Sequence, residues 1–322
     1  MDPQSPPIQW ELTACPLCGS RESRRLIEAP EPDGPPHGPL FQIVACRGCG
    51  LCYTNPRPDA ASLGRFYGPD YGPHRRCGLS PGQRRAARRW AWMPQGLRVG
   101  NPAERGWPPQ GQARLLDVGC GGGKFLERMH LQGWRVTGLD LSAAMVERMR
   151  RQLRLPALVG QLPHPELTSA RFELVTMWQS LEHLPQPLEA LKEAHRLLAP
   201  GGRLMVSVPN IESGPFRWFG PAWYGVELPR HLIHFNPATL RQMMQAAGFT
   251  VERVRMIPKS DWLRASARLA QREDSCCVKR GRRLYPRLWT PLLRWRPLSG
   301  LAARYCQLTG QSDCLLAIGR KG

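Results

Sequence analysis

The middle of the chain alternates short apolar runs with stretches in which apolar positions recur at helical spacing. Residues 115–118 are mostly apolar and lead into a glycine-rich turn, so they predict the end of a buried strand. Gly119, Gly121 and Gly123 permit a tight turn and a close approach of the backbone to a ligand. From Lys124 the apolar positions return at helical spacing. This order is typical of a nucleotide-type cofactor site at the carboxyl end of a parallel strand.

The spacing of the glycine loop selects among cofactors. A dinucleotide loop has the pattern G-x-G-x-x-G/A, whereas residues 119–123 read G-x-G-x-G and Lys124 takes the place of the third glycine. Asp117 would oppose a pyrophosphate, but its carboxylate suits a cofactor that carries an ammonium group. Asp140 ends a second predicted strand, 23 residues beyond Asp117, where an acid binds a ribose diol. A ribose and an amine without a pyrophosphate describe S-adenosylmethionine (SAM).

Four segments in this order resemble the class I SAM-dependent methyltransferases. They are residues 115–123, 136–142, 172–187 (FELVTMWQSLEHLPQP) and 197–210 (LLAPGGRLMVSVPN). The resemblance covers about residues 111–259 and the last predicted strand near 314–320. It implies an α/β fold with a Rossmann-like, seven-stranded, mostly parallel sheet.

The resemblance also implies residue roles. The three glycines of the loop would line the methionine part of SAM. Asp117 would reach its amino group, and Asp140 would hold the ribose hydroxyls. The other side chains expected around the cofactor are Cys120, Leu141, Gln161 and Trp178. Gln161 stands where many relatives place an acid near the adenine. Alone, a glycine-rich turn can be mere architecture and Asp140 can cap a helix, but the ordered set of four segments favours the cofactor site.

Composition bounds the class of protein. The 322 residues suit one large or two modest domains, and no run of eighteen apolar residues predicts a membrane span. The polar, proline-rich start lacks the apolar core of a signal peptide, and the eleven cysteines do not form a small secreted framework, so we expect a reducing cytoplasmic compartment. The net charge of +20 fits either a nucleic-acid or anionic-membrane partner or a GC-rich genome, since only five of the 45 basic residues are lysines.

The N-terminal residues 1–58 predict a zinc-ribbon module. Residues 15–19 read C-P-L-C-G and residues 46–50 read C-R-G-C-G, and each glycine frees backbone amides to bond sulfur. Two such pairs present four thiolates, from Cys15, Cys18, Cys46 and Cys49. An all-thiolate site leaves no position for water, so the zinc would be structural. A redox role is the alternative for a lone C-x-x-C pair, but two glycine-flanked pairs favour zinc.

Residues 59–110 predict a basic linker with a short helix around 81–93, either a solvated connector or a segment that closes over the cofactor cleft. The methyltransferase domain would then occupy 111–322. A ribbon followed by residues 51–58 and 66–72 resembles a bacterial branch whose relatives methylate sugars on nucleotide carriers, quinone-type phenols and other small molecules. The core is also similar to the ubiquinone-type O-methyltransferases, which lack the ribbon.

The loops after the later strands are the candidates for acceptor chemistry. The strand at 174–177 delivers Trp178, Glu182 and His183 to the rim of the sheet, and Glu182-His183 is expected to open the next helix. The [DNS]-P-P-[YFW] tetrad of many nucleic-acid amine methyltransferases is absent here. No cysteine between Cys120 and Cys276 offers a nucleophile for pyrimidine C5 chemistry.

A second candidate is the aromatic loop at 218–235, between the strand at 203–208 and a helix at 237–247. His231 is the preferred general base, with His234 and Tyr224 as neighbours and His183 as a further candidate. The alternative is that one histidine caps the next helix and the other is packed.

Strands are predicted at 249–257 and 313–319, and the family resemblance implies that they pair antiparallel at the edge of the sheet. Between them lies a basic aromatic insert at about 260–308. The insert carries eleven basic and three acidic residues, a net charge of +8, interleaved with Trp and Leu. Such a segment fits a helix on an anionic membrane, an acceptor-site lid, an RNA-facing patch or a packed helical hairpin with a solvated arginine face.

These features predict a SAM-dependent methyltransferase that acts on a small-molecule acceptor, with O-methylation of a sugar, phenolic or lipid-linked substrate favoured. An RNA methyltransferase that uses the ribbon and the arginine-rich segments is an alternative, as is a non-catalytic SAM-binding protein. The expected location is the cytoplasm, with peripheral contact to an anionic membrane as an option; nucleic acid is the less favoured partner. The sequence makes no prediction of the oligomeric state.

Overall fold

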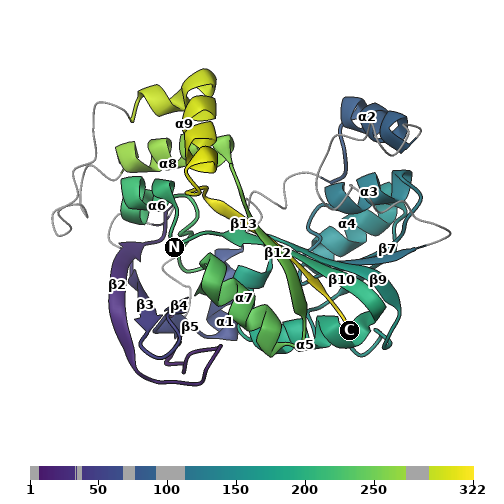
Figure 1. Ribbon diagram of the computed structural model, residues 1–322, viewed down its shortest axis with the longest axis horizontal. Helices are drawn as coiled ribbons and strands as arrows, with labels where there is room; N and C mark the ends of the chain where they lie inside the picture. Colours follow the sequence, from purple (N-terminus) through teal and green to yellow (C-terminus); the bar gives the residue numbers. More distant parts are fainter. Residues whose placement is uncertain (1–6, 33, 35–37, 68–76, 92–112, 273–289) are drawn as a thin grey trace.

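A seven-stranded sheet forms the centre of the computed structural model, which describes residues 7–32, 34, 38–67, 77–91, 113–272 and 290–322. The strand order is β12-β13-β10-β9-β6-β7-β8 (Figure 1). The strands are β6 (Arg114–Val118), β7 (Arg135–Asp140), β8 (Ala157–Val159), β9 (Phe172–Trp178), β10 (Leu198–Pro209), β12 (Thr250–Ile257) and β13 (Cys314–Arg320). All neighbours from β10 to β8 are parallel, and β13 is antiparallel to both β10 and β12. The predicted mostly parallel, seven-stranded sheet is confirmed.

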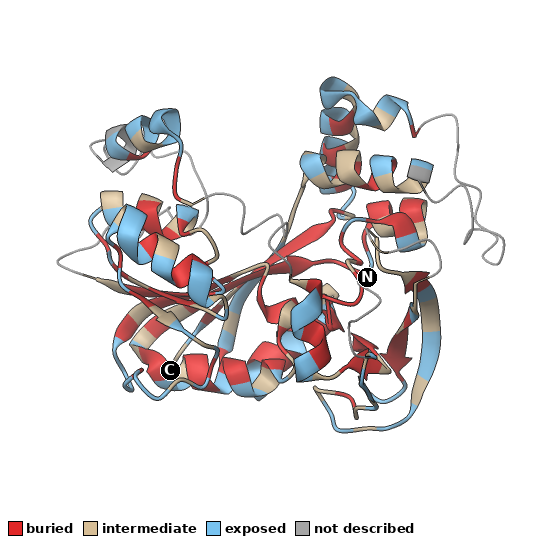
Figure 2. Ribbon diagram, turned by 180° about the vertical axis from the view of Figure 1, so that it is seen from behind, coloured by how far each residue is buried: buried red, intermediate tan, exposed pale blue. Residues whose placement is uncertain are grey.

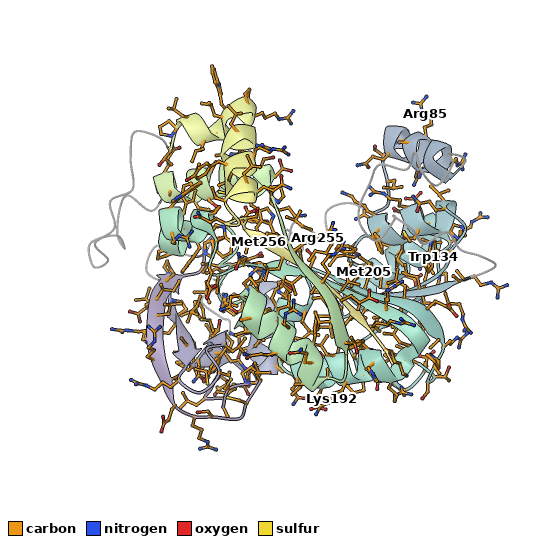
Figure 3. All side chains as sticks on the ribbon, viewed as in Figure 1. Arg85, Trp134, Lys192, Met205, Arg255 and Met256 are labelled. Atoms are coloured by element: carbon orange, nitrogen blue, oxygen red, sulfur yellow. The ribbon has the colours of Figure 1, made fainter. Side chains whose placement is uncertain are left out.

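Helices cover both faces of this sheet, which explains why its central strands are almost entirely apolar. Successive residues of β6 point to opposite sides, so Leu115 joins the core beneath α3 (Lys124–Leu131) and α4 (Ala143–Leu153). Leu116 joins the core beneath α5 (Pro187–Leu197) and α7 (Pro237–Ala246). Trp134 and Met205, which Figure 3 labels, belong to the same core as Leu115.

The cysteine-rich N-terminal segment builds a second sheet, which shares a hydrophobic core with one face of the seven-stranded sheet. Its order is β11-β4-β3-β2, from β2 (Ser23–Pro30), β3 (Leu40–Cys46), β4 (Cys52–Thr54) and β11 (Ile233–His234). A short pair of strands, β1 (Trp10–Glu11) and β5 (Arg57–Pro58), is followed by α1 (Ala60–Leu63) and η1 (Gly64–Phe66). Because β11 comes from the aromatic loop, the ribbon and that loop form one continuous structure, and buried residues occur in both (Figure 2).

Residues 77–91 of the predicted linker pack against the glycine loop and α3. Helix α2 (Pro81–Ala91) lies within the predicted helix. The Gly78 amide donates to the carbonyl of Gly122 at 2.6 Å, and the Leu79 amide donates to Glu127 on α3 at 2.6 Å. Arg84 also bonds Glu127, while Arg85 points outward (Figure 3). Residues 68–76 and 92–110 of the predicted linker lie outside the described residues.

The described part of the insert forms two packed helices, α8 (Ser260–Arg272) and α9 (Arg296–Leu308), with η9 (Leu292–Arg294) before α9. Of the four alternatives for the insert, the packed helical hairpin describes these two helices, and α8 rests on α6 (Gly214–Phe219) and η6 (Gly220–Ala222) (Figure 1). Residues 273–289 lie outside the described residues. Among the helices the structure describes, none has the length and apolar character needed to cross a membrane.

Candidate active site

The glycine loop joins β6 to α3 in a conformation that only glycine adopts easily. Gly119 has φ of 74°, and a Cβ there would lie 2.5 Å from the Cβ of Ser180. Gly121 has φ of 49°, and a Cβ there would meet no atom within 4 Å, so the backbone borders open space. The amides of Gly119 and Cys120 donate to the Leu139 carbonyl on β7, which ties the loop to the neighbouring strand. The loop therefore offers a fixed backbone edge beside room for a ligand.

Asp140 ends β7 beside this loop, as predicted. Its Oδ2 accepts the Gly121 amide at 2.8 Å, and its Oδ1 accepts the Ser142 amide at 2.9 Å. The cap of α4 is instead Ser142, whose hydroxyl accepts the Met145 amide. Each carboxylate oxygen keeps a second lone pair, so Asp140 can still accept two hydroxyl donors, which is the requirement for holding a ribose diol.

Asp117 is a carboxylate buried at the carboxyl end of β6. It is only 3% exposed, and the Thr176 hydroxyl donates to its Oδ1 at 2.7 Å. Burial raises the pKa of Asp117 to about 7, and the nearby charge of Asp140 contributes to the increase. An ammonium group bound at Asp117 would offset that electrostatic cost, so this carboxylate fits the amine of SAM, as the sequence predicts.

The remaining residues predicted around the cofactor occupy different environments. Trp178 ends β9 with its ring 5.2 Å from that of Phe125 on α3, and its buried Nε1 has no hydrogen-bond partner among the described residues. Leu141 is 67% exposed beside Asp140, and Gln161 is exposed after β8. The Cys120 side chain lies in the core beneath α3 and α4, so this residue offers the site only its backbone.

The aromatic loop places His231 in the protein interior, where it is 3% exposed. Its Nδ1 lies 2.9 Å from the carbonyl of Gly225, and its Nε2 lies 3.3 Å from Oε2 of Glu227. This ion-pair geometry alone would favour a charged imidazole, but Arg230 already pairs with the same carboxylate at 2.9 Å. Burial prevails and lowers the pKa of His231 to about 4, so the ring is neutral at pH 7.

His183 lies against His231, with 4.6 Å between the ring centroids, and it keeps partial exposure to solvent. Its Nδ1 lies 2.9 Å from the Tyr67 hydroxyl and 3.1 Å from the Arg230 carbonyl. Because the carbonyl can only accept, we assign the proton to Nδ1, which leaves the Nε2 lone pair free. Burial and the neighbouring His231 lower the pKa of His183 to about 3, so it too is neutral.

Glu182 completes this histidine cluster. It is 0% exposed, and neither carboxylate oxygen has a hydrogen-bond partner among the described residues. Burial raises its pKa well above the ordinary value. Ligand atoms of Glu182, His183 and His231 lie within 4.8 Å of one another, so the three side chains have the spacing to hold a cation. The prediction that Glu182-His183 opens a helix is wrong: the pair lies in η5 (Leu181–His183), separated from α5 because Pro185 and Pro187 delay the helix start.

The other two predicted neighbours, His234 and Tyr224, have different environments. His234, on β11, has its Nε2 3.2 Å from the Thr54 hydroxyl of β4, and that hydroxyl donates to the His231 carbonyl at 2.8 Å. Burial lowers the pKa of His234 well below its usual range. Tyr224 packs against Trp262 of α8, with ring centroids 5.6 Å apart. The ribbon strand thus holds the backbone on which two of the histidines lie.

The four cysteines of the ribbon come together as predicted. Their sulfurs lie within 4.8 Å of one another, with Cys15 3.5 Å from Cys49 and Cys18 3.5 Å from Cys46. Gly19 and Gly50 take φ of 74° and 77°, but their amides bond the carbonyls of Cys15 and Cys46 rather than sulfur. Burial acts to raise the pKa of Cys46, but amides within its own knuckle and the Cys18 and Cys15 thiols outweigh it and lower the pKa to about 7.

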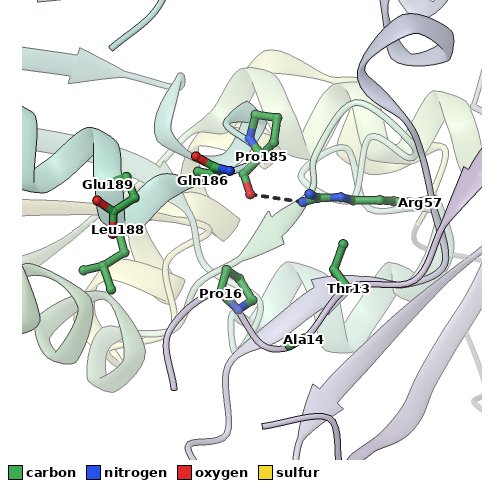
Figure 4. Close-up of a pocket in the computed structure, with 8 residues that line it drawn as sticks. All are labelled: Thr13, Ala14, Pro16, Arg57, Pro185, Gln186, Leu188 and Glu189. Atoms are coloured by element: carbon green, nitrogen blue, oxygen red, sulfur yellow. Dashed lines mark hydrogen bonds between the residues drawn. The ribbon is translucent and has the colours of Figure 1, made fainter. Parts of the chain in front are cut away.

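A surface pocket at the junction between the ribbon and α5 contains none of the predicted site residues. Thr13, Arg57, Pro185 and Leu188 are among the residues that line it (Figure 4). Arg57 donates to the Pro185 carbonyl at 3.2 Å and pairs with Glu11 at 2.6 Å. The first bond joins the ribbon module to the segment before α5, whereas the ion pair lies within the module, between β1 and β5.

A parallel sheet of this strand order, with a glycine loop after β6 and acids at the ends of β6 and β7, defines a class I SAM-dependent methyltransferase. A family model described as a methyltransferase domain matches residues 83–254. This is more than half of the chain, so the protein belongs to this methyltransferase family and is a SAM-dependent enzyme.

Similar proteins include two ubiquinone biosynthesis O-methyltransferases. That of Alkalilimnicola ehrlichii is 36% identical over 140 residues, which cover 39% of this chain and 56% of the relative. That of Xanthomonas euvesicatoria pv. vesicatoria is 31% identical over 180 residues, which cover 50% of this chain and 72% of the relative. A solved SAM-dependent methyltransferase from Mesorhizobium loti aligns with a TM-score of 0.44 and 19% identity, over 73% of this chain and 96% of that chain.

Sequence reasoning missed the residues that arrange the histidines: Thr54, Tyr67, Glu227 and Arg230. Tyr67 and Thr54 lie within the N-terminal stretches that carry the resemblance to the ribbon branch, which was the only available signal. Their partners are between 116 and 180 residues away along the chain, so no local pattern links them.

Asp117 generates a prediction about stability. Its folded pKa of about 7 exceeds the unfolded value of 3.8, so the cofactor-free protein loses stability as the pH rises from about 4 to about 7. Asp117→Asn should therefore be more stable than wild type at pH 8, by up to about 4 kcal/mol, with the difference vanishing near pH 4. Urea denaturation of both proteins between about pH 4 and pH 8 measures this difference in the free energy of unfolding. Glu166→Gln, an exposed carboxyl, is the control; a pH-independent effect of Asp117→Asn would contradict the assignment.

Proposed function

We propose that the enzyme transfers the methyl group of SAM to a hydroxyl of a small acceptor, a phenolic, sugar or lipid-linked compound. The observation that carries this proposal is the neutral histidine cluster after β9, where His183 uses Nδ1 for its hydrogen bonds and its Nε2 has no partner among the described residues. The O-methyltransferase names of the relatives support the choice of oxygen. The RNA-methyltransferase and non-catalytic alternatives gain no support from these relatives.

The cofactor-binding half orients the donor. When bound, SAM supplies an electrophilic methyl group on a sulfonium. In our proposal, Asp117 binds the ammonium group, Asp140 accepts the two ribose hydroxyls, and the backbone at Gly121 borders the methionine part. Trp178 follows on β9, where its Nε1 is buried without a hydrogen-bond partner among the described residues. Positioning of this kind supplies a large share of a methyl-transfer rate.

The histidine cluster handles the proton of the acceptor. We propose that His183 Nε2 accepts the hydroxyl proton as the oxygen–methyl bond forms and the sulfur–methyl bond breaks. His231 and Tyr67 act as positioning residues, because they contact His183 and hold its ring. A pKa of about 3 makes His183 a weak base, so it serves best an acceptor that is itself acidic, such as a phenol. His231 is 3% exposed, whereas His183 keeps partial exposure, so we propose His183 rather than His231 as the group that meets the acceptor.

We further propose that the four cysteines of the ribbon hold a structural zinc ion. A tetrahedral site with Zn–S bonds of about 2.3 Å places its sulfurs roughly 3.8 Å apart, close to the observed 3.5 Å. The metal would secure β3 and β4, and through Thr54 it would fix the backbone of His231 and His234. In this proposal the ribbon supports acceptor chemistry and leaves cofactor binding to the other half of the sheet.

Asp140→Ala should weaken SAM binding by at least about 2 kcal/mol, roughly thirtyfold, because it removes charge-assisted hydrogen bonds to the ribose. Calorimetric titration measures the dissociation constant, and circular dichroism should show an intact fold. Glu147→Gln, an exposed carboxyl on the adjacent α4, is the matched control. Undiminished affinity of Asp140→Ala would refute the ribose assignment.

His183→Gln should lower kcat by roughly 10²- to 10³-fold while the dissociation constant for SAM stays unchanged, because general-base catalysis is lost and the cofactor half is untouched. Labelled-methyl transfer from SAM into lipid and small-molecule pools provides the assay and tests the proposed acceptor class. His130→Gln, an exposed histidine on α3, should behave as wild type. Full turnover in His183→Gln would remove His183 from the mechanism.

Cys46→Ser should release the metal and lower turnover while SAM binding persists. Loss of one thiolate opens the site and frees β4 from β11, which loosens the histidines but leaves the glycine loop in place. Metal content, kcat and SAM affinity should be measured on the same sample, with Cys77→Ser as the control. Unchanged metal content, or a loss of SAM affinity equal to the loss of turnover, would count against this division of roles.

A further inference from the structure

The outward face of α9 is apolar where a surface helix normally presents polar groups. The helix packs through Ser299, Ala303 and Cys306. The side away from these residues carries Leu301, Tyr305 and Leu308, which are 67%, 56% and 73% exposed. These three recur at the i, i+4, i+7 spacing of a single helical stripe. An amphipathic helix of a globular protein would place charged or polar residues there.

The apolar surface continues across η9. Trp295 is 70% exposed and Leu292 is 44% exposed, directly before the first turn of α9. We call Leu292, Trp295, Leu301, Tyr305 and Leu308 the docking face. Exposed large apolar residues concentrated on one short segment mark an interaction site, whereas scattered ones need no explanation.

Positive charge surrounds the docking face. Arg294, Arg296 and Arg304 are all exposed, and the sequence contains no acidic residue from 275 to 312. Arg296 and Arg304 form no ion pair within the part of the chain that the structure describes. Trp, Tyr and Leu interleaved with Arg is the composition of a helix that lies in the interfacial region of a membrane.

Helix α8 connects the docking face to the aromatic loop at 218–235, which we also call the acceptor loop. Arg264 of α8 donates to the Ser299 hydroxyl of α9 at 3.0 Å. On the other side of α8, the Tyr224 amide donates to Ser266 at 2.9 Å, and Trp262 packs against Tyr224. In Figure 1, α9 and α8 stand together beside α6, next to the acceptor half of the sheet.

We propose that the docking face binds the surface of a bilayer that carries anionic headgroups. The apolar side chains enter the interfacial region and the arginines meet lipid phosphates, so the acceptor loop lies close to the membrane. Delivery of a lipid-linked acceptor to His183 rests on the proposed function; the docking itself does not.

Flotation with vesicles tests the docking with the full-length protein. Wild type should float with phosphatidylcholine vesicles that contain phosphatidylglycerol, float poorly with pure phosphatidylcholine, and detach as salt is raised. W295S/L301S/L308S should lower vesicle affinity at least roughly tenfold, because it removes most of the inserted apolar surface. R296E/R304E should lower it by roughly tenfold or more, because repulsion replaces attraction.

Matched controls separate the docking face from general surface effects. L12S changes another highly exposed leucine, 82% exposed on the ribbon, and R241E changes an exposed arginine on α7; both should float as wild type. All variants should keep wild-type SAM affinity. The proposal would be overturned if the wild-type protein failed to float with anionic vesicles. It would also be overturned if W295S/L301S/L308S and R296E/R304E both floated as well as wild type.

The same docking-face variants also distinguish the membrane from two other partners, RNA and a second copy of this chain. Salt-sensitive binding of RNA without flotation would assign the face to nucleic acid. A dimer that W295S/L301S/L308S converts to monomer, without flotation, would assign it to a second copy. Each result overturns membrane docking. Flotation together with no methyl transfer into lipid pools would leave the docking intact and refute only the lipid-linked acceptor.

Discussion

The burial of one carboxylate beside another is the constraint on which the cofactor half of this enzyme depends. Parallel strands bring Asp117 and Asp140 to the same edge of the sheet, and the glycine loop closes over them. Nothing in the described residues neutralises Asp117: its hydrogen bond comes from an uncharged threonine hydroxyl, and its pKa is raised to about 7. In the free protein, burial makes the ionised form of Asp117 costly. A positively charged ligand would offset this cost, because it stabilises the carboxylate that burial has removed from water.

A second arrangement shapes the acceptor half. The loop that follows β10 contributes a strand to the ribbon sheet, so residues 233–234 and 52–54 form one ladder. Thr54 at one end and Tyr67 at the other hold the histidine cluster between them. In the proposed function, the cysteine module thereby supports the acceptor site rather than standing as an appended domain. Residues 77–91 of the predicted linker are similarly tied to the seven-stranded body, because Leu79 and Arg84 bind Glu127 of α3.

The sequence was sufficient to predict those parts of the site in which the functional residues and the turn that positions them lie within a few residues of each other. The glycine loop, Asp140 at the end of β7 and the two cysteine knuckles were predictable because spacing alone determines them. The sheet was predictable in order only through resemblance. The burial of His231 was not predictable, since it follows from Glu227, Arg230 and Gly225 folding back around one ring. The helix expected at Glu182 did not form there, because prolines at 185 and 187 shift its start, and its residues pack into a short turn instead.

The most direct measurement of the central claim is the number of protons released when SAM binds. Calorimetric titrations near pH 6.5, in buffers with different ionisation enthalpies, give that number. The account predicts release of between about half and one proton per SAM bound, because the ammonium group requires an ionised Asp117, and it predicts no such release in Asp117→Asn. Binding with no proton release in the wild-type protein would show that Asp117 is not the partner of the cofactor's positive charge.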